Sequence, residues 1–237
     1  MTYAPPATRR RSTGWLAVVL VVLLLAAAAV AVDRWFVTET ERRVATELEP
    51  SIGARPDVSI GGFPFLTQYA AGELDDVRIT ADTVTYTDLT LTDVTFDAAG
   101  VPTDLTQPVG QVRVDAVVPA DTLTAALQNA EGVPDGVTIV TQDGAVVASV
   151  SVLGLPIEAT LAPRPDGRAI AVDVEEVTIG GAVVSVVDLP AFVADALTGL
   201  RVELDQLPEG LELTTCEVTD DGVRLVAEGT DVVLPTG

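Results

Sequence analysis

The stretch DVRITADTVTYTDLTLTDVTFD, residues 76–97, decides the fold class because apolar and polar side chains alternate along it. This period of two is typical of antiparallel strands that bury one face and expose the other to water. The same period is present at Val58–Ile60 and at Val112–Val114. We therefore expect a largely antiparallel sheet from about residue 57 onward.

The alternation changes parity twice, between Ile79 and Val84 and between Leu91 and Val94. A shift of one residue moves the apolar set to the other face of a strand unless the strand bulges or turns. The two shifts therefore predict bulges or tight turns in a strongly bent sheet.

A helix-plus-hairpin unit occurs twice, at about 119–150 and 190–228. In each copy a short amphipathic helix (119–127 and 190–197) precedes the pattern φPxGφxφ, where φ is apolar, and then an Asp-Gly hairpin turn. Two such units predict an α+β fold in which one strongly curved antiparallel sheet wraps around short helices, because the concave face can bury their apolar stripes. Since Asp-Gly is a favoured hairpin turn, chance similarity is the alternative.

The N-terminal part divides into an arginine-rich tail (1–14), an uncharged run (15–32) and an amphipathic linking helix (33–50) that Pro50 ends. As a helix at ~1.5 Å per residue, the run covers about 27 Å, close to the ~30 Å thickness of a bilayer core. It therefore predicts a single membrane span that carries the domain formed by residues 51–237.

The charges around this run predict its orientation. Arg9, Arg10 and Arg11 precede it, which places the N-terminus in the cytoplasm and the domain outside, and Trp15 and Trp35 stand at the two membrane interfaces. The alternative is a secretory signal cleaved after the small residues at 29–31, which would release the domain. A lipoprotein is excluded because no cysteine follows the run.

The exported part is strongly acidic. After Val32 ten arginines face all 35 acidic residues, a net charge of −25. The negative electrostatic field of this charge repels nucleic acid and disfavours broad adsorption to anionic membranes, so we expect no nucleic-acid partner. We interpret the acidity as solubilising; a calcium-binding role is the alternative, although no calcium-loop motif is present.

The chain lacks histidine and lysine, and Cys216 is its one cysteine. These absences remove serine-histidine, serine-lysine and Schiff-base chemistry, histidine metal sites and any internal disulfide. We therefore expect no catalytic residue, metal or cofactor, and we interpret Cys216 as a small buried apolar residue rather than a reactive thiol.

An aromatic block stands out at 60–69, IGGFPFLTQY, which holds three of the ten aromatic residues of the chain. The glycines allow a sharp exit from the preceding strand, and Pro64 favours the first turn of a short helix. Two interpretations remain open: the helix plugs the end of the core, or it forms the apolar mouth of a lipid pocket. Likewise, the long apolar strands at 145–162 and 169–179 require a cover, either a helix or an acyl chain.

The string VSIGGFPFLTQ (58–68), followed by Gly72, Val77 and Ile79, resembles the signature of the LmeA-type phospholipid-binding family of actinobacterial cell-envelope proteins. The resemblance implies a module similar to the tubular lipid-binding proteins, in which a curved sheet encloses an apolar groove for acyl chains. It supplies no catalytic residues. We assign lipid contacts to Phe63, Pro64, Phe65, Leu66, Tyr69, Phe96 and Phe192, and headgroup contacts to Arg55, Arg78 and Arg113.

These observations favour non-enzymatic binding or transfer of phospholipid or a related envelope lipid, with the lipid and the membrane as partners. An acyl chain buried at ~0.8 kcal/mol per methylene needs no special chemistry from its pocket. The alternatives are a structural or protein-interaction domain of the envelope and, less favoured because aromatics for sugar stacking are few, a two-carboxylate hydrolase.

Overall fold

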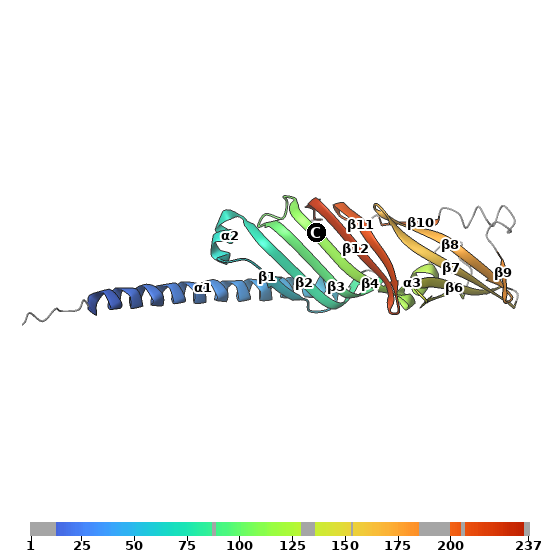
Figure 1. Ribbon diagram of the computed structural model, residues 1–237, viewed down its shortest axis with the longest axis horizontal. Coiled ribbons are helices and arrows are strands. Elements are labelled where there is room, and N and C mark those ends of the chain that lie inside the picture. Colours follow the sequence, from blue (N-terminus) through green and yellow to red (C-terminus); the bar gives the residue numbers. More distant parts are fainter. Residues whose placement is uncertain are drawn as a thin grey trace, which may run out of the picture.

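The computed structural model describes residues 13–86, 89–128, 136–152, 154–184, 200–204 and 207–234. Within these residues strands predominate, and two β-sheets are accompanied by the helices α1 (Thr13–Ile52), α2 (Phe65–Ala71) and α3 (Ala120–Gln128). Figure 1 shows an elongated molecule whose long direction runs parallel to α1, with the two sheets following one another along it.

A single helix, α1, covers both the apolar run and the linking segment. Pro50 lies inside it, and the helix ends at Ile52, two residues later than we expected. Gly53 follows with φ of 79°, and its N–H donates to the carbonyl of Glu49 at 3.0 Å. This left-handed glycine terminates the helix because only a residue without a Cβ adopts that conformation at no cost.

Sheet A joins the N-terminal strands to the C-terminal hairpin. Its order is β1 (Asp57–Ile60), β2 (Glu73–Tyr86), β3 (Leu89–Pro102), β4 (Val109–Pro119), β12 (Gly222–Val233) and β11 (Glu209–Thr219), with every pairing antiparallel. Sheet B has the order β10 (Leu200–Glu203), β8 (Ala169–Ile179), β7 (Leu155–Asp166), β6 (Ala145–Val152) and β5 (Thr138–Gln142), and β9 (Ala182–Val184) also pairs with β8.

The prediction of a β-rich fold with few helices and an N-terminal apolar helix is confirmed, but the prediction of one sheet was wrong, because the described strands divide between two sheets. Neither sheet is closed or strongly curled, so the predicted curvature is not confirmed. The Asp-Gly hairpin of the first repeat copy, β5–β6, belongs to sheet B, whereas that of the second copy, β11–β12, belongs to sheet A. The reason is long-range pairing: β12 pairs with β4, which leaves β5 and β6 to continue into β7. The second predicted helix, 190–197, lies outside the described residues.

One of the two parity shifts is a bulge. The pairing of β3 with β4 shifts register between Thr92 and Thr95, where Asp93 has a φ of 51°. The other shift is not a bulge, because β2 and β3 keep one register from Thr80–Thr95 to Val84–Leu91. Within β2 the apolar side chains therefore change from one face of the strand to the other without any change in its pairing with β3.

The register gives sheet A two unlike faces. Residues that pair across all six strands form one row of apolar side chains, and the next row consists of polar and charged side chains. The apolar row is Val58, Ile79, Phe96, Val114, Ala227 and Leu213, and the charged row is Ser59, Arg78, Asp97, Arg113, Glu228 and Glu212. We call these the apolar face and the charged face of sheet A.

The two sheets meet around α3 and the β7–β8 turn. A buried cluster of Ile139, Val146 and Val223 joins β5 and β6 of sheet B to β12 of sheet A, and Leu123 of α3 packs against it. At the turn, the N–H of Leu213 donates to the carbonyl of Gly167 at 2.7 Å, and Arg168 donates to the carbonyls of Leu207 and Pro208. Backbone hydrogen bonds and a shared core therefore connect the sheets.

Candidate functional site

The apolar face of sheet A is a candidate binding surface. At the β1 end α1 and α2 cover it through the buried cluster of Val37, Ile60 and Phe65, and α3, which directly follows β4, lies against β3 and β4 and against β5 of sheet B. Between these covers Ile79, Phe96 and Val114 are only half-buried, although they are neighbours in one row of the sheet. This middle part presents apolar surface that the described helices leave partly open.

The aromatic block forms a tight corner between β1 and β2. Gly62 has a φ of 83°, and a Cβ there would lie 2.1 Å from Nε2 of Gln68. The buried amide of Gln68 closes the corner, because its Nε2 donates to the carbonyl of Gly61 and its Oε1 accepts from the N–H of Asp75 at 2.9 Å. The glycines and the glutamine of the motif are therefore explained by local structure.

Asp33 of α1 caps α2 from a distance of 33 residues. Its Oδ1 accepts the N–H of Leu66 at 3.0 Å, whereas Pro64, at the N-cap position, provides no side-chain hydrogen bond. The Asp33 side chain is 3% exposed, and its Oδ2 has no hydrogen-bond partner. Our sequence analysis missed this residue because nothing local links Asp33 to the aromatic block.

The block contains both a plug and an exposed surface. Phe65 is 3% exposed and packs against Val37 and Ile60, so it plugs the core as one of our two interpretations predicted. In contrast, Phe63 is 54% exposed and Tyr69 60% exposed, and Leu66 is exposed beside them. The guanidinium of Arg34 lies 5.7 Å from the centre of the Phe63 ring.

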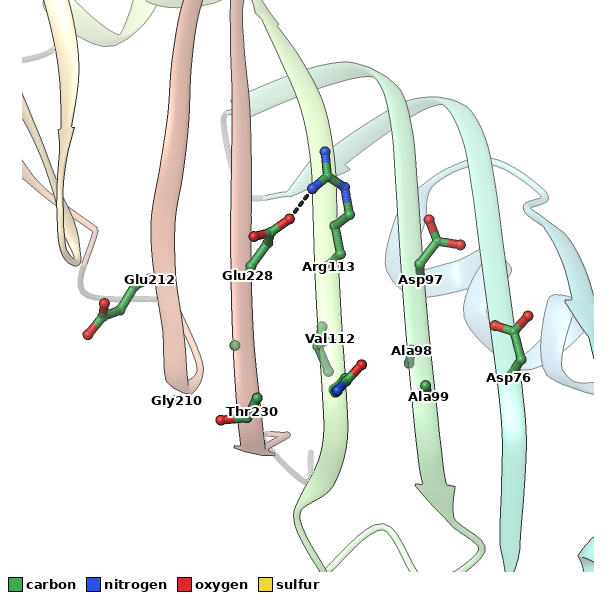
Figure 2. A pocket seen from close by; sticks show the side chains of 12 residues that line it. Asp76, Asp97, Ala98, Ala99, Val112, Arg113, Gly210, Glu212, Glu228 and Thr230 are labelled. Carbon is green, nitrogen blue, oxygen red and sulfur yellow. Dashed lines mark hydrogen bonds and ion pairs between the residues drawn. The ribbon is translucent and has the colours of Figure 1, made fainter.

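The charged face carries an open hollow of about 740 Å³. Figure 2 shows Arg113 of β4 reaching Glu228 of β12, with Asp97 and Asp76 on the neighbouring strands. Small residues on the floor leave the space open, whereas the rim is rich in carboxylates, namely Asp76, Asp97, Glu212 and Glu228. This hollow is therefore a poor site for a phosphate.

Two of the three expected headgroup arginines lie on this charged face. Arg78 is paired with Asp97, whose hydrogen bond raises the pKa of the arginine, and Arg113 is paired with Glu228. Both project from the side of the sheet opposite to Phe96, and each is engaged in an ion pair. Arg55 instead lines a hollow of about 240 Å³ between α1 and β1, together with Arg42, Glu41 and Asp57.

The structure places the other expected lipid contacts apart. Phe96 is half-buried in the middle of the apolar face, Pro64 begins the exposed corner, and Phe192 lies outside the described residues. Arg42, which our sequence analysis did not single out, joins Arg55 because α1 passes beside the start of β1. The sequence signal for Arg42 is its place in the helix. It is a polar position next to Val37, Glu41 and Ala45, the side of α1 that faces the domain.

Within the described residues, no three histidine, cysteine, aspartate or glutamate side chains gather as metal ligands. Cys216 is half-buried, and burial raises the pKa of its thiol to about 11. A thiol with such a pKa is overwhelmingly protonated at neutral pH and is a weak nucleophile. This agrees with our interpretation of Cys216 as a packing residue.

Fold and surface together define a class: an extended β-sheet protein with one broad apolar sheet face and an N-terminal helix long and apolar enough to cross a membrane. The chain belongs to the LmeA-like phospholipid-binding family, whose model matches residues 31–228, and this confirms the resemblance in its sequence. A search of the curated proteins and a search of the solved structures each found no match. The match begins two residues before Asp33 and includes the aromatic block and most of both sheets.

Proposed function

We propose that the protein binds phospholipid or a related envelope lipid, without catalysing a reaction, at the outer face of the cytoplasmic membrane. The acyl chains lie against the half-open middle of the apolar face, over Ile79, Phe96 and Val114. Residues 15–32 anchor the domain, with the N-terminus inside.

The observation that carries this proposal is the apolar row itself. Six paired residues contribute no polar side chain, yet the three in the middle stay half-buried, which is costly for a sheet face without a ligand. Each methylene that leaves water there contributes ~0.8 kcal/mol, so part of one acyl chain supplies several kcal/mol. Membership of the phospholipid-binding family supports the same ligand class.

The headgroup lies at the hollow between α1 and β1, which Arg42 and Arg55 line. Guanidinium groups suit a phosphate because they donate paired hydrogen bonds. Arg42 belongs to α1, which covers the β1 end of the apolar face, and Arg55 lines the same hollow beside it, whereas Arg78 and Arg113 are ion-paired on the other face. We therefore propose Arg55, with Arg42, as the headgroup contact.

A pair of neighbouring substitutions on β3 tests the binding surface. Phe96→Asn places an amide in the middle of the apolar face, whereas Thr95→Asn makes a similar change on the charged face of the same strand. The full chain would be expressed in its membrane and purified in mild detergent, and bound lipid would be measured by native mass spectrometry and by extraction.

We expect lipid to co-purify with the unchanged chain and with Thr95→Asn, and to be reduced several-fold with Phe96→Asn. Circular dichroism would establish that each variant is folded. A folded, unchanged chain that carries no lipid would refute the proposal and favour a structural or protein-interaction role. Equal lipid content in both variants would refute the location on the apolar face.

A further inference from the structure

We propose that the exposed part of the aromatic block, together with the nearby aromatics of α1, inserts into the interfacial layer of the phospholipid leaflet that α1 crosses. We call this surface the interfacial collar: Trp35, Phe36, Phe63, Leu66 and Tyr69. The inference rests on the proposed membrane anchorage and adds a second contact between the domain and the membrane.

The domain begins to cover α1 close to the end of its apolar run. Every described side chain of α1 from Leu20 to Val32 is exposed, and the first buried one is Asp33. From there a stripe spaced by four residues, Asp33, Val37, Glu41 and Ala45, faces the domain. The domain therefore starts at the residue where the uncharged run ends.

Helix α2 is fixed close to the same level of α1. The hydrogen bond of 3.0 Å from the N–H of Leu66 to Asp33, and the packing of Phe65 on Val37, hold α2 beside the exit of the apolar run. Figure 1 shows α2 at the end of the sheets nearest the free N-terminal half of α1. Trp35 and Phe36 are only two and three residues beyond Asp33, about 3–4.5 Å along the helix axis. The headgroup layer is roughly 5–7 Å thick on each side, so Trp35 and Phe36 fall within it, and α2 is held beside them.

The side chains of the collar have the chemistry of a membrane interface. The exposed side chains of the collar are aromatic and aliphatic, and Tyr, Trp and Phe favour the membrane–water interface. Residues 61–72 contain no charged side chain, although the exported part carries a net charge of −25. Arg34, whose guanidinium lies over Phe63, adds a cation beside the phosphates. An uncharged aromatic surface with an adjacent arginine suits a phospholipid leaflet, whereas the acidic surface elsewhere does not.

Tryptophan fluorescence in vesicles tests the collar. The two natural tryptophans, Trp15 and Trp35, would be changed to phenylalanine in the full chain, and one reporter would be introduced, Tyr69→Trp in the collar or Val183→Trp as a control. Val183 is exposed on β9, at the opposite end of the molecule in Figure 1. The vesicles would contain phosphatidylethanolamine and phosphatidylglycerol, with a share of lipid brominated either near the headgroup or near the chain end.

We expect emission from Tyr69→Trp to shift to the blue and to be quenched several-fold more by the shallow bromine than by the deep one. The control should not be quenched. Equal, negligible quenching of the two reporters in a chain that floats with the vesicles and retains lipid would overturn the collar and leave the proposed function standing. A blue shift that depends on protein concentration and occurs without quenching would also overturn the collar. In that case a second copy of the chain, and not the lipid, would cover the surface. Failure to float or to retain lipid would contradict the proposed function itself.

Discussion

Neighbouring residues of the aromatic block have different roles, and burial separates them. Phe65 points into the core between α1 and β1, whereas Phe63 and Tyr69 point away from it. Our sequence analysis recognised the block but could not assign these directions, because a short helix after a glycine pair can present either set of side chains inward. The cap from Asp33 decides the direction, and it comes from a residue far away in the chain.

Alanine substitutions at Phe65 and Phe63 should therefore differ sharply. Phe65→Ala opens a cavity in a closed cluster and should lower the free energy of unfolding by about 3–5 kcal/mol. Phe63→Ala removes a comparable side chain from an exposed site and should cost less than about 1 kcal/mol. Chemical denaturation of the full chain in detergent micelles, followed by circular dichroism, measures both. Equal losses for the two variants would contradict the described corner.

Cys216 gives a prediction that depends on pH. With a pKa near 11, the folded thiol is ~0.1% thiolate at pH 8, so alkylation by iodoacetamide should be roughly two orders of magnitude slower than in the denatured chain. The rate should rise about tenfold per pH unit up to about pH 11. Because the folded pKa is raised, the unfolded chain loses its proton first, and the folded state should lose stability as pH rises from about 9 to 11. A rate that levels off near pH 9 would show that the thiol is not buried as described.

At the scale of elements, the sequence predicted the strands of sheet A well and their partners poorly. Alternation assigns each side chain to one of two faces, so the apolar row and the charged row follow from residues 57–97 and 109–118 once the register is known. Nothing local pairs β4 with β12, which lies more than a hundred residues later. For the same reason the helix-plus-hairpin repeat was visible, but its division between two sheets was not.

The bulge in β3 can be tested at Asp93. A positive φ costs a β-branched residue more than aspartate, and glycine nothing, so Asp93→Val should destabilise the fold by about 1–2 kcal/mol while Asp93→Gly should not. Thr95→Val, on the same strand beyond the bulge, serves as the control. The free energy of unfolding measures all three. If Asp93→Val left the free energy of unfolding unchanged, the bulge of β3 would not lie at position 93.

At the scale of the whole molecule, the described parts of the two sheets are joined by a buried cluster near α3 and by hydrogen bonds at the β7–β8 turn. The guanidinium of Arg168 contributes to this junction by donating to two backbone carbonyls, that of Pro208 at 2.7 Å. No sequence pattern pointed to Arg168, because its partners are backbone atoms about forty residues away. The junction lies within residues 31–228, the part of the chain that the family match covers.

Removal of this arginine should uncouple the sheets. Arg168→Ala leaves two half-buried carbonyls without a charged donor and should cost about 2–3 kcal/mol. Amide hydrogen exchange should quicken first in β10 and β11, which flank the junction. Arg164→Ala, which breaks an exposed ion pair with Asp173 on the same hairpin, should leave exchange unchanged. Equal exchange in both variants would show that the hydrophobic cluster alone holds the sheets together.

The unbroken course of α1 has a mechanical consequence. The helix is continuous from its apolar half through the stripe that contacts the domain, so in the proposed membrane anchorage it would act as a rigid rod held in the bilayer. Membrane helices tilt by about 20° on average, and more when the bilayer is thin relative to the helix. Over the roughly 28 Å of helix from Asp33 to Ile52, such a tilt moves the upper end sideways by about 10 Å. Bilayer thickness should therefore set the angle at which the sheets stand above the membrane, a quantity that electron paramagnetic resonance distances in vesicles of different chain length would measure.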